Sequence, residues 1–177
     1  MPGPVEVFFF KVRGRMDRSG LKRIISRLPG DRVCVLIDRD SIVSDMHLRS
    51  AFMHAARSIL TGRCRAKDPS MEVLRYAAGS RQVGEGVTIA GPNEGTEVLI
   101  IAMAPSDWPV NGDGDPLPEI IVGDPSRIGY DKEMLGTIEG IDHWGGVSAA
   151  RRILSVDMAG LDPELAVLER IALADMR

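Results

Sequence analysis

The stretch that most constrains the fold is residues 68–90, which read DPSMEVLRYAAGSRQVGEGVTIA. Asp68 can accept a hydrogen bond from an unpaired backbone N–H, and Pro69 suits the first position of a helix, where its missing N–H costs nothing. Gly79 can adopt the left-handed conformation that ends a helix. The stretch therefore predicts a capped helix, a glycine break, a polar elbow at residues 80–82 and the start of a second helix.

The first of these two helices has a clear division of faces. Met71, Leu74 and Ala78 form one apolar stripe at helical spacing. Glu72 and Arg75 lie outside this stripe, and they are three residues apart, a spacing at which opposite charges on a helix surface can pair. The pattern predicts a solvated polar face that carries both charges.

Apolar periodicity elsewhere in the chain predicts the other elements. Strands are expected at residues 5–13, 33–38 and 96–104, with a short edge strand at residues 119–122. The continuous apolar run at 33–38 favours a position in the centre of the sheet. Helices are expected at residues 17–28, from Ser44 or Asp45 through Ile59, at 131–140 and from Asp162 onward. This order predicts a mixed α/β (α+β) domain and leaves the strand order open.

Two of the predicted helices carry distinct stripes. In the helix that ends near Ile59, the expected buried positions are Leu48, Phe52, Ala55 and Ile59. A polar stripe recurs at the same spacing and comprises His47, Ser50, His54 and Arg57. The last helix begins with Asp162 and Pro163, a second cap-and-proline start, and its expected buried face comprises Leu165, Leu168, Ile171 and Ala172.

Length and composition predict one folded domain over residues 1–177. The chain has 177 residues, of which 44% are hydrophobic and 27% charged, enough for one packed domain and too few for two ordinary ones. Its two cysteines show no disulfide or metal-binding pattern, which suits a reducing cytosol. No apolar run approaches the roughly 20 residues that span a bilayer. We therefore expect a cytoplasmic protein without a membrane partner.

Charge is divided unevenly along the chain. Residues 1–90 carry 16 Lys and Arg against 9 Asp and Glu, whereas residues 91–177 carry 6 against 16. A basic half supplies the cations that displace counterions from a phosphate backbone. An uneven but functionally neutral surface explains the same numbers, so charge alone leaves RNA binding open.

No set of residues predicts catalysis. Asp38 and Asp40 are the best acid pair, because residues two apart on a strand share a face, but a solvated strand-to-helix turn explains them as well. His47 and His54 are seven residues apart, not the four that would let two imidazoles share a zinc ion. The sequence therefore predicts a binding protein and not an enzyme, with no catalytic residues, metal ion, cofactor or small-molecule substrate.

Three segments in order resemble a known family. DMHLRSAFMHAARSI, then MEVLRYAAGSRQV with Gly91 and the strand VLIIA after it, and finally LAVLERIAL resemble the kinase-binding (TPRKB-like) small subunit of the KEOPS complex. The resemblance spans roughly residues 45–177. Residues 105–118 and about 142–161 look like loop insertions relative to the family. Gly84 and Gly86 replace better helix formers, which weakens the prediction of the second helix in the motif.

The resemblance implies a fold and a function. The expected fold is a small, mostly antiparallel sheet of about four strands with helices packed on it. The expected function is that of a non-catalytic regulatory subunit in tRNA processing, within the complex that makes threonylcarbamoyladenosine. Such a subunit binds the kinase-like ATPase subunit of KEOPS and recruits tRNA through its single-stranded 3′ CCA end.

The resemblance and the distribution of charge together suggest two sets of site residues. The tRNA-binding set is cationic, since guanidinium groups bond phosphates and stack on bases: Arg75, Arg81, Lys67, Arg65, His54 and Arg57. The kinase-binding set is Glu72, Ser80, Gln82, His47 and Glu169. The sequence alone does not establish which residue of the motif faces which partner.

Two other functions remain open at this point. One is a small α/β enzyme that uses Asp38 and Asp40 on a phosphorylated substrate and has a deep pocket at the end of the second strand. The other is a pure protein–protein adaptor that binds the kinase and has lost affinity for RNA.

Overall fold

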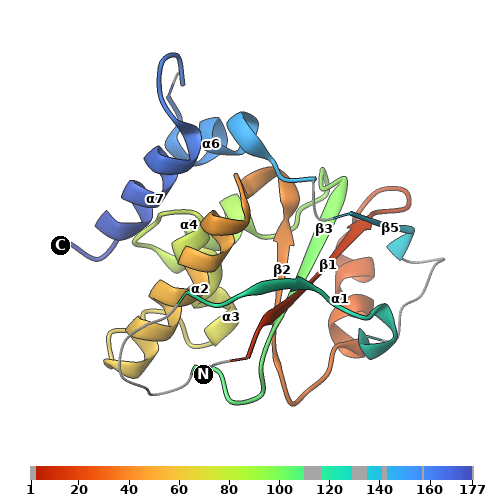
Figure 1. Ribbon diagram of the computed structural model, residues 1–177. Helices are drawn as coiled ribbons and strands as arrows, with labels where there is room; N and C mark the ends of the chain where they lie inside the picture. Colours follow the sequence, from red (N-terminus) through yellow and green to blue (C-terminus); the bar gives the residue numbers. More distant parts are fainter. Residues whose placement is uncertain (1–2, 110–116, 129–134, 141–142, 157, 177) are drawn as a thin grey trace.

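The computed structural model describes residues 3–109, 117–128, 135–140, 143–156 and 158–176. Its centre is a mixed sheet with helices on both faces (Figure 1). The strands are β1 (Val5–Lys11), β2 (Val33–Asp38), β3 (Val98–Ala104), β4 (Ile120–Val122) and β5 (Thr137–Glu139). The predicted α+β class with a small, mostly antiparallel sheet is confirmed, with five strands within the described ranges in place of about four.

The sheet is ordered β2-β3-β1-β4, and β5 also pairs with β1. β3 is antiparallel to both β1 and β2, whereas β4 is parallel to β1. The predicted central position of residues 33–38 is wrong, because β2 lies at the edge. Its apolar run has another cause: Val35 and Ile37 pack in the core on one face, while Cys34 and Leu36 pack on the other.

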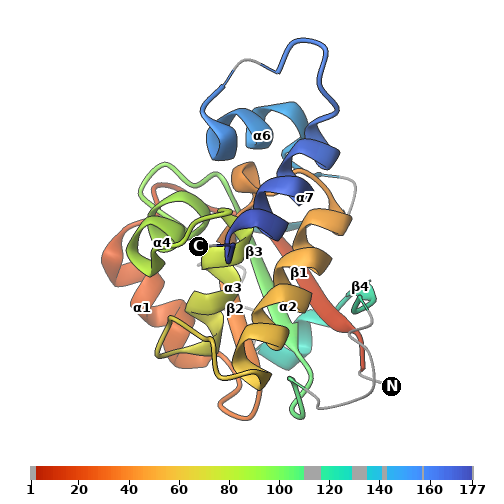
Figure 2. The same ribbon diagram turned by 90° about the vertical axis from the view of Figure 1, so that its left-hand side faces the viewer.

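Helices form the outer layers. They are α1 (Arg18–Arg27), α2 (Asp45–Leu60), α3 (Pro69–Ala77), α4 (Val83–Ala90), α6 (Gly146–Leu154) and α7 (Pro163–Leu173), with short 3-10 turns η1 (Arg39–Ser41) and η2 (Pro125–Ile128). α1 covers one face of the sheet, and α2 and α3 cover the other (Figure 1). α7 packs against α2 and α6 (Figure 2). None of the helices in the described ranges combines the length and apolar character that crossing a bilayer requires.

The predicted helix starts are confirmed by their capping hydrogen bonds. The Asp68 carboxylate accepts from Ser70 N at 2.8 Å, and the Asp162 carboxylate accepts from Glu164 N at 3.0 Å. The Ser44 hydroxyl accepts from His47 N at 3.3 Å. These bonds satisfy backbone donors that have no partner within the helix.

Two segments differ from their prediction. Residues 137–139 form β5 and pair with β1, although a helix was expected at 131–140, of which residues 131–134 lie outside the described ranges. Gly136 precedes β5 at φ +73°, and an added Cβ would lie 2.1 Å from Lys11 O. The segment expected as a loop at 142–161 contains α6. In residues 105–118, the described positions 105–109 and 117–118 contain no helix or strand, and the rest lie outside the described ranges.

Candidate functional site

The elbow between α3 and α4 is held by side chains from several elements. Gly79 ends α3 at φ +59°, as predicted. Four consecutive carbonyls then each accept a side-chain hydrogen bond: Gly79 O from Arg170 Nε (3.1 Å), Ser80 O from Arg75 Nη1 (3.1 Å), Arg81 O from Arg65 Nη1 (2.9 Å) and Gln82 O from Ser80 Oγ (3.2 Å). Three of the donors are arginines. The elbow is therefore a rigid frame that presents the side chains of residues 81 and 82 to solvent.

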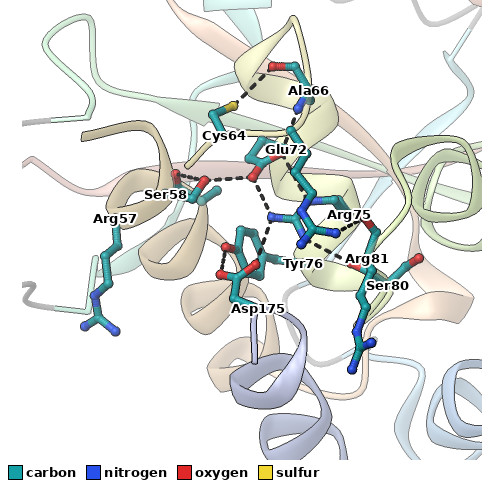
Figure 3. Close-up of polar contacts among 12 residues, drawn as sticks. Arg57, Ser58, Cys64, Ala66, Glu72, Arg75, Tyr76, Ser80, Arg81 and Asp175 are labelled. Atoms are coloured by element: carbon teal, nitrogen blue, oxygen red, sulfur yellow. Dashed lines mark hydrogen bonds and ion pairs between the residues drawn. The ribbon is translucent and has the colours of Figure 1, made fainter. Parts of the chain in front are cut away.

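A buried ion pair lies directly beneath this frame. Glu72 and Arg75 are both 0% exposed, and two hydrogen bonds join them: Nη2 to Oε1 at 2.6 Å and Nε to Oε2 at 3.2 Å. The Glu72 carboxylate also accepts from Ser58 Oγ (2.7 Å) and Ala66 N (3.1 Å) (Figure 3). Burial alone would raise the pKa of Glu72, but hydrogen bonds from Arg75 and Ser58 outweigh it and hold that pKa below its usual value.

The C-terminal segment completes the network. Arg75 Nη2 lies 3.3 Å from Asp175 Oδ1, and the Tyr76 hydroxyl donates to the same carboxylate. Burial and this hydrogen bond raise the pKa of Tyr76 to about 12. The Arg75 guanidinium also lies over the Tyr76 ring, 4.2 Å from its centre. Asp175 follows α7 closely, so its contact with Arg75 connects the C-terminal segment to α3, 100 residues earlier in the chain.

These contacts correct part of the predicted site. Arg75 is not a surface cation, because its guanidinium is buried and bonded to two carboxylates. Glu72, Ser80 and His47, predicted to contact the kinase, are likewise buried, at 0%, 4% and 0% exposure. The i,i+3 spacing of Glu72 and Arg75 is typical of a surface pair, and nothing in that spacing signals burial.

The other predicted residues surround the network at the surface. Four cations from α2, the following loop and the elbow are exposed: Arg57, Arg65, Lys67 and Arg81. Figure 3 shows the guanidinium groups of Arg57 and Arg81 directed away from the buried pair. His54 is half-buried, and its ring stacks on Tyr76 at 5.5 Å. Gln82 and Glu169, predicted to contact the kinase, are exposed.

His47 has a structural role between α2 and α3. Its Nε2 donates to Ala77 O at 2.8 Å, and its Nδ1 accepts from Val43 N at 3.0 Å. This arrangement requires the neutral ring, because a proton on Nδ1 would face another donor. Burial lowers the pKa of His47 to about 4, partly offset by the bond to Ala77.

We expect stability to fall when the solution is acidified below the pKa of an unfolded histidine. The unfolded chain protonates His47 near pH 6.5, whereas the folded protein does so only near pH 4. The contribution of the neutral His47 ring to the free energy of unfolding is therefore complete above pH 6.5. It decreases by about 3 kcal/mol as the pH falls to 4. Urea unfolding of the wild type and of His47→Gln between pH 4 and 7.5 measures it. The variant should show a flatter pH dependence, and identical pH profiles for the two proteins would contradict the assignment.

The acid pair considered for catalysis is part of a turn. The Asp38 carboxylate accepts from Asp40 N (3.0 Å) and Thr96 Oγ1 (3.2 Å) and pairs with Arg152 (3.0 Å). Asp40 pairs with Arg39 at 3.2 Å. Asp38 thus connects the end of β2 with η1 and α6, whereas the ion pair of Asp40 lies within η1. Within the described ranges no cluster of three or more metal-ligating side chains exists.

Two features escaped the sequence-based prediction. Gly86 lies against α3: an added Cβ would lie 2.5 Å from Arg75 Cα, so the glycine permits the close approach of α4. On α7, Val167 and Ile171 are buried, whereas Leu165 is 65% exposed, which reverses part of the predicted apolar face. The exposed face of α7 and the residues after it contains Leu165, Glu169, Ala172 and Met176. Their spacing of four, three and four residues was visible in the sequence, but the direction of the face was not.

The comparison with protein families identifies a family for this chain. The sequence model of the family described as "Kinase binding protein CGI-121" matches residues 19–137. The chain belongs to the CGI-121 family. No curated protein matches the chain significantly.

Membership in the CGI-121 family supports an accessory, kinase-binding role. The match includes α1 through β4 with the elbow, so it starts earlier than the expected residue 45. It ends before α6 and α7, so the segment that supplies Arg170 and Asp175 to the elbow network lies outside the matched part.

Proposed function

We propose that this CGI-121 protein is a non-catalytic, cytoplasmic subunit of a KEOPS-type complex that makes threonylcarbamoyladenosine in tRNA. It binds the kinase-like ATPase subunit and recruits tRNA through the single-stranded 3′ CCA end. The observation that supports tRNA recruitment is the rigid elbow that presents exposed Arg81, together with three further exposed cations on α2 and on the loop before α3: Arg57, Arg65 and Lys67.

The elbow suits a single-stranded RNA end for electrostatic and entropic reasons. Arginine bonds phosphate through two parallel N–H groups and stacks on bases through its planar face. Because the elbow backbone is already fixed by Arg65, Arg75 and Arg170, binding does not have to order it. The Tyr76 hydroxyl is bonded to Asp175 and its ring faces His54 and Arg75, so stacking on bases falls to the exposed guanidinium groups.

The surface proposed for the kinase is the outer face of α7 with the residues that follow. Leu165 (65% exposed), Leu173 (45%) and Met176 (70%) are apolar side chains in contact with solvent, and Glu169 lies among them. Exposed apolar groups beside polar ones are typical of protein-binding surfaces. Gln82 on the elbow is the second exposed member of the predicted kinase set.

A mobility-shift assay tests recruitment with intact tRNA and with tRNA trimmed of its CCA end. Trimming should remove most of the affinity. Arg81→Gln should weaken binding of intact tRNA about tenfold, the loss of one charge-assisted contact, and reduce the slope of log affinity against log salt by about one. The matched control is Arg151→Gln on α6, an exposed arginine distant in sequence from the elbow, which should behave as wild type.

The same assay separates the proposal from the adaptor function. Equal affinity for intact and trimmed tRNA would refute CCA recruitment. A protein that co-purifies with the kinase and binds neither tRNA would be an adaptor alone.

A further inference from the structure

Helix α1 has an unusual charge composition. Its ten residues include four cations, Arg18, Lys22, Arg23 and Arg27, and no acid. Arg18 with Lys22 and Arg23 with Arg27 are like-charge pairs four residues apart, each of which destabilises a helix by about 0.2–0.5 kcal/mol. A cation in the first turn also opposes the helix dipole. Helix stability therefore does not account for this composition.

The three cations toward the start of α1 lie around a surface hollow. Arg18, Ser19, Lys22, Arg23 and Ser26 line it. We call these five residues the α1 cationic face. Within the described ranges, Arg18, Lys22 and Arg23 form no ion pair.

The acid that precedes α1 along the chain caps the helix and forms no ion pair with these cations. Asp17 precedes the helix, and its carboxylate accepts from Gly20 N at 2.6 Å as the helix cap. The Ser26 hydroxyl donates to Arg23 O at 2.8 Å, which leaves Ser19 as the hydroxyl donor of the hollow. The surface thus offers three cations and one hydroxyl to an anionic ligand.

We propose that the α1 cationic face binds the phosphodiester backbone of RNA, as a second RNA site distinct from the elbow. Three cations spread over two turns of a helix match several phosphates of an extended polyanion better than one small anion, because the hollow is open and the described residues that line it include no buried donor. Among the described residues no aromatic side chain lines the face, so we expect contacts with the RNA backbone and not with bases. Binding there is therefore independent of RNA sequence.

The packing of α1 favours RNA over a membrane surface. A membrane-bound amphipathic helix needs an exposed apolar face. The apolar face of α1 is instead turned into the core, where Ile24 is 3% exposed and Leu21 and Leu28 pack against the same cluster. Ile25, at 56% exposure, is a single apolar side chain and forms no face.

This site goes beyond the proposed function, since it requires neither a CCA end nor a kinase. α1 covers the face of the sheet opposite to α2 and α3, so the two RNA sites lie on different sides of the protein (Figure 1). A tRNA held by its CCA end at the elbow and a helical RNA segment at α1 are separate contacts. An experiment can therefore disprove RNA binding at one of these two sites without disproving it at the other.

The experiment measures binding of the full chain to a blunt RNA duplex without single-stranded ends. A duplex of about 16 base pairs, the length that one double-stranded RNA module spans, is followed by fluorescence anisotropy from low to physiological salt. Wild type should bind with a dissociation constant of about 10⁻⁶–10⁻⁴ M and a log–log salt slope of about −2 to −3, as expected for three phosphate contacts. The triple variant Arg18→Gln, Lys22→Gln, Arg23→Gln should lose both the binding and the slope.

Matched charge reversals distinguish a local effect of the α1 cations from an effect of the net charge of the protein. Lys22→Glu and Arg151→Glu change the net charge equally at exposed positions of two helices, but only Lys22→Glu should weaken duplex binding, by about tenfold or more. Thermal unfolding checks that the triple variant is folded, and removal of like-charge repulsion should leave it at least as stable as wild type.

Three results would overturn the inference. Duplex binding that survives the triple substitution would place the contact elsewhere, and equal losses in Lys22→Glu and Arg151→Glu would show only a net-charge effect. Preferential binding to phosphatidylserine vesicles over RNA would assign the face to a membrane. Loss of duplex binding in the triple variant with CCA-dependent tRNA binding intact would support it.

Discussion

Replacing Glu72 by alanine should lower the free energy of unfolding by about 3–5 kcal/mol, because it leaves the buried Arg75 guanidinium without its main partner. Asp175 cannot substitute for Glu72, since its carboxylate is 37% exposed and more distant, at 3.3 Å. Ser58 Oγ and Ala66 N would also lose their shared acceptor. Urea unfolding monitored by circular dichroism measures the loss.

Two comparisons make the Glu72 result specific. Glu94 pairs with Arg15 at the surface, with side chains 69% and 76% exposed, so Glu94→Ala should cost less than about 1 kcal/mol. The double variant Glu72→Met, Arg75→Met removes both charges and should recover part of the stability that Glu72→Ala loses. A loss in Glu72→Ala no larger than in Glu94→Ala would contradict a structural role for the buried pair.

Gly86→Ala and Gly84→Ala should have opposite effects on stability, although each substitution adds one methyl group to α4. An added Cβ at Gly86 would lie 2.5 Å from Arg75 Cα and 2.9 Å from Arg75 N, so α4 would have to move away from α3. Overpacking of this kind costs about 1–3 kcal/mol or more. Gly84 has no atom within 4 Å of the added Cβ, so alanine there should stabilise the helix by about 0.5–1 kcal/mol.

Thermal unfolding of both variants tests this pair, with wild type as the reference. Because α4 follows the elbow, Gly86→Ala should also weaken binding of intact tRNA while the folded fraction remains measurable. Destabilisation of equal size at both positions would show that helix propensity, and not the contact with Arg75, controls α4.

The elbow and the C-terminus form one structural unit. Arg170 binds Gly79 O, and Asp175 binds Arg75 and Tyr76, so α7 supports the backbone that presents Arg81. An added Cβ at Gly79 would lie 2.5 Å from Arg170 Cγ, so the glycine also makes room for this support. The proposed kinase surface on α7 and the proposed tRNA surface on the elbow are therefore joined by a few bonds. Neither surface can shift without disturbing the contacts of the other.

Features that depend on neighbours within a few residues could be predicted from the amino-acid order. The starts of α3 and α7 at Asp68 and Asp162 were predicted correctly, because a cap involves only the next few backbone N–H groups. The left-handed Gly79 followed for the same local reason. The α+β class followed from the periodicity and order of the elements.

Features that depend on partners distant in the chain became visible only in the folded protein. Arg75 appeared in the sequence as a surface cation, and it is buried because Ser58, Glu72 and Asp175 converge from three elements to satisfy it and its partner. Gly86 appeared as a weak helix former, and it proved to be the contact that lets α4 approach α3. The spacing of residues along one helix shows which of them share a face. Only the packing of other helices against that face determines whether it is turned to water or to the core.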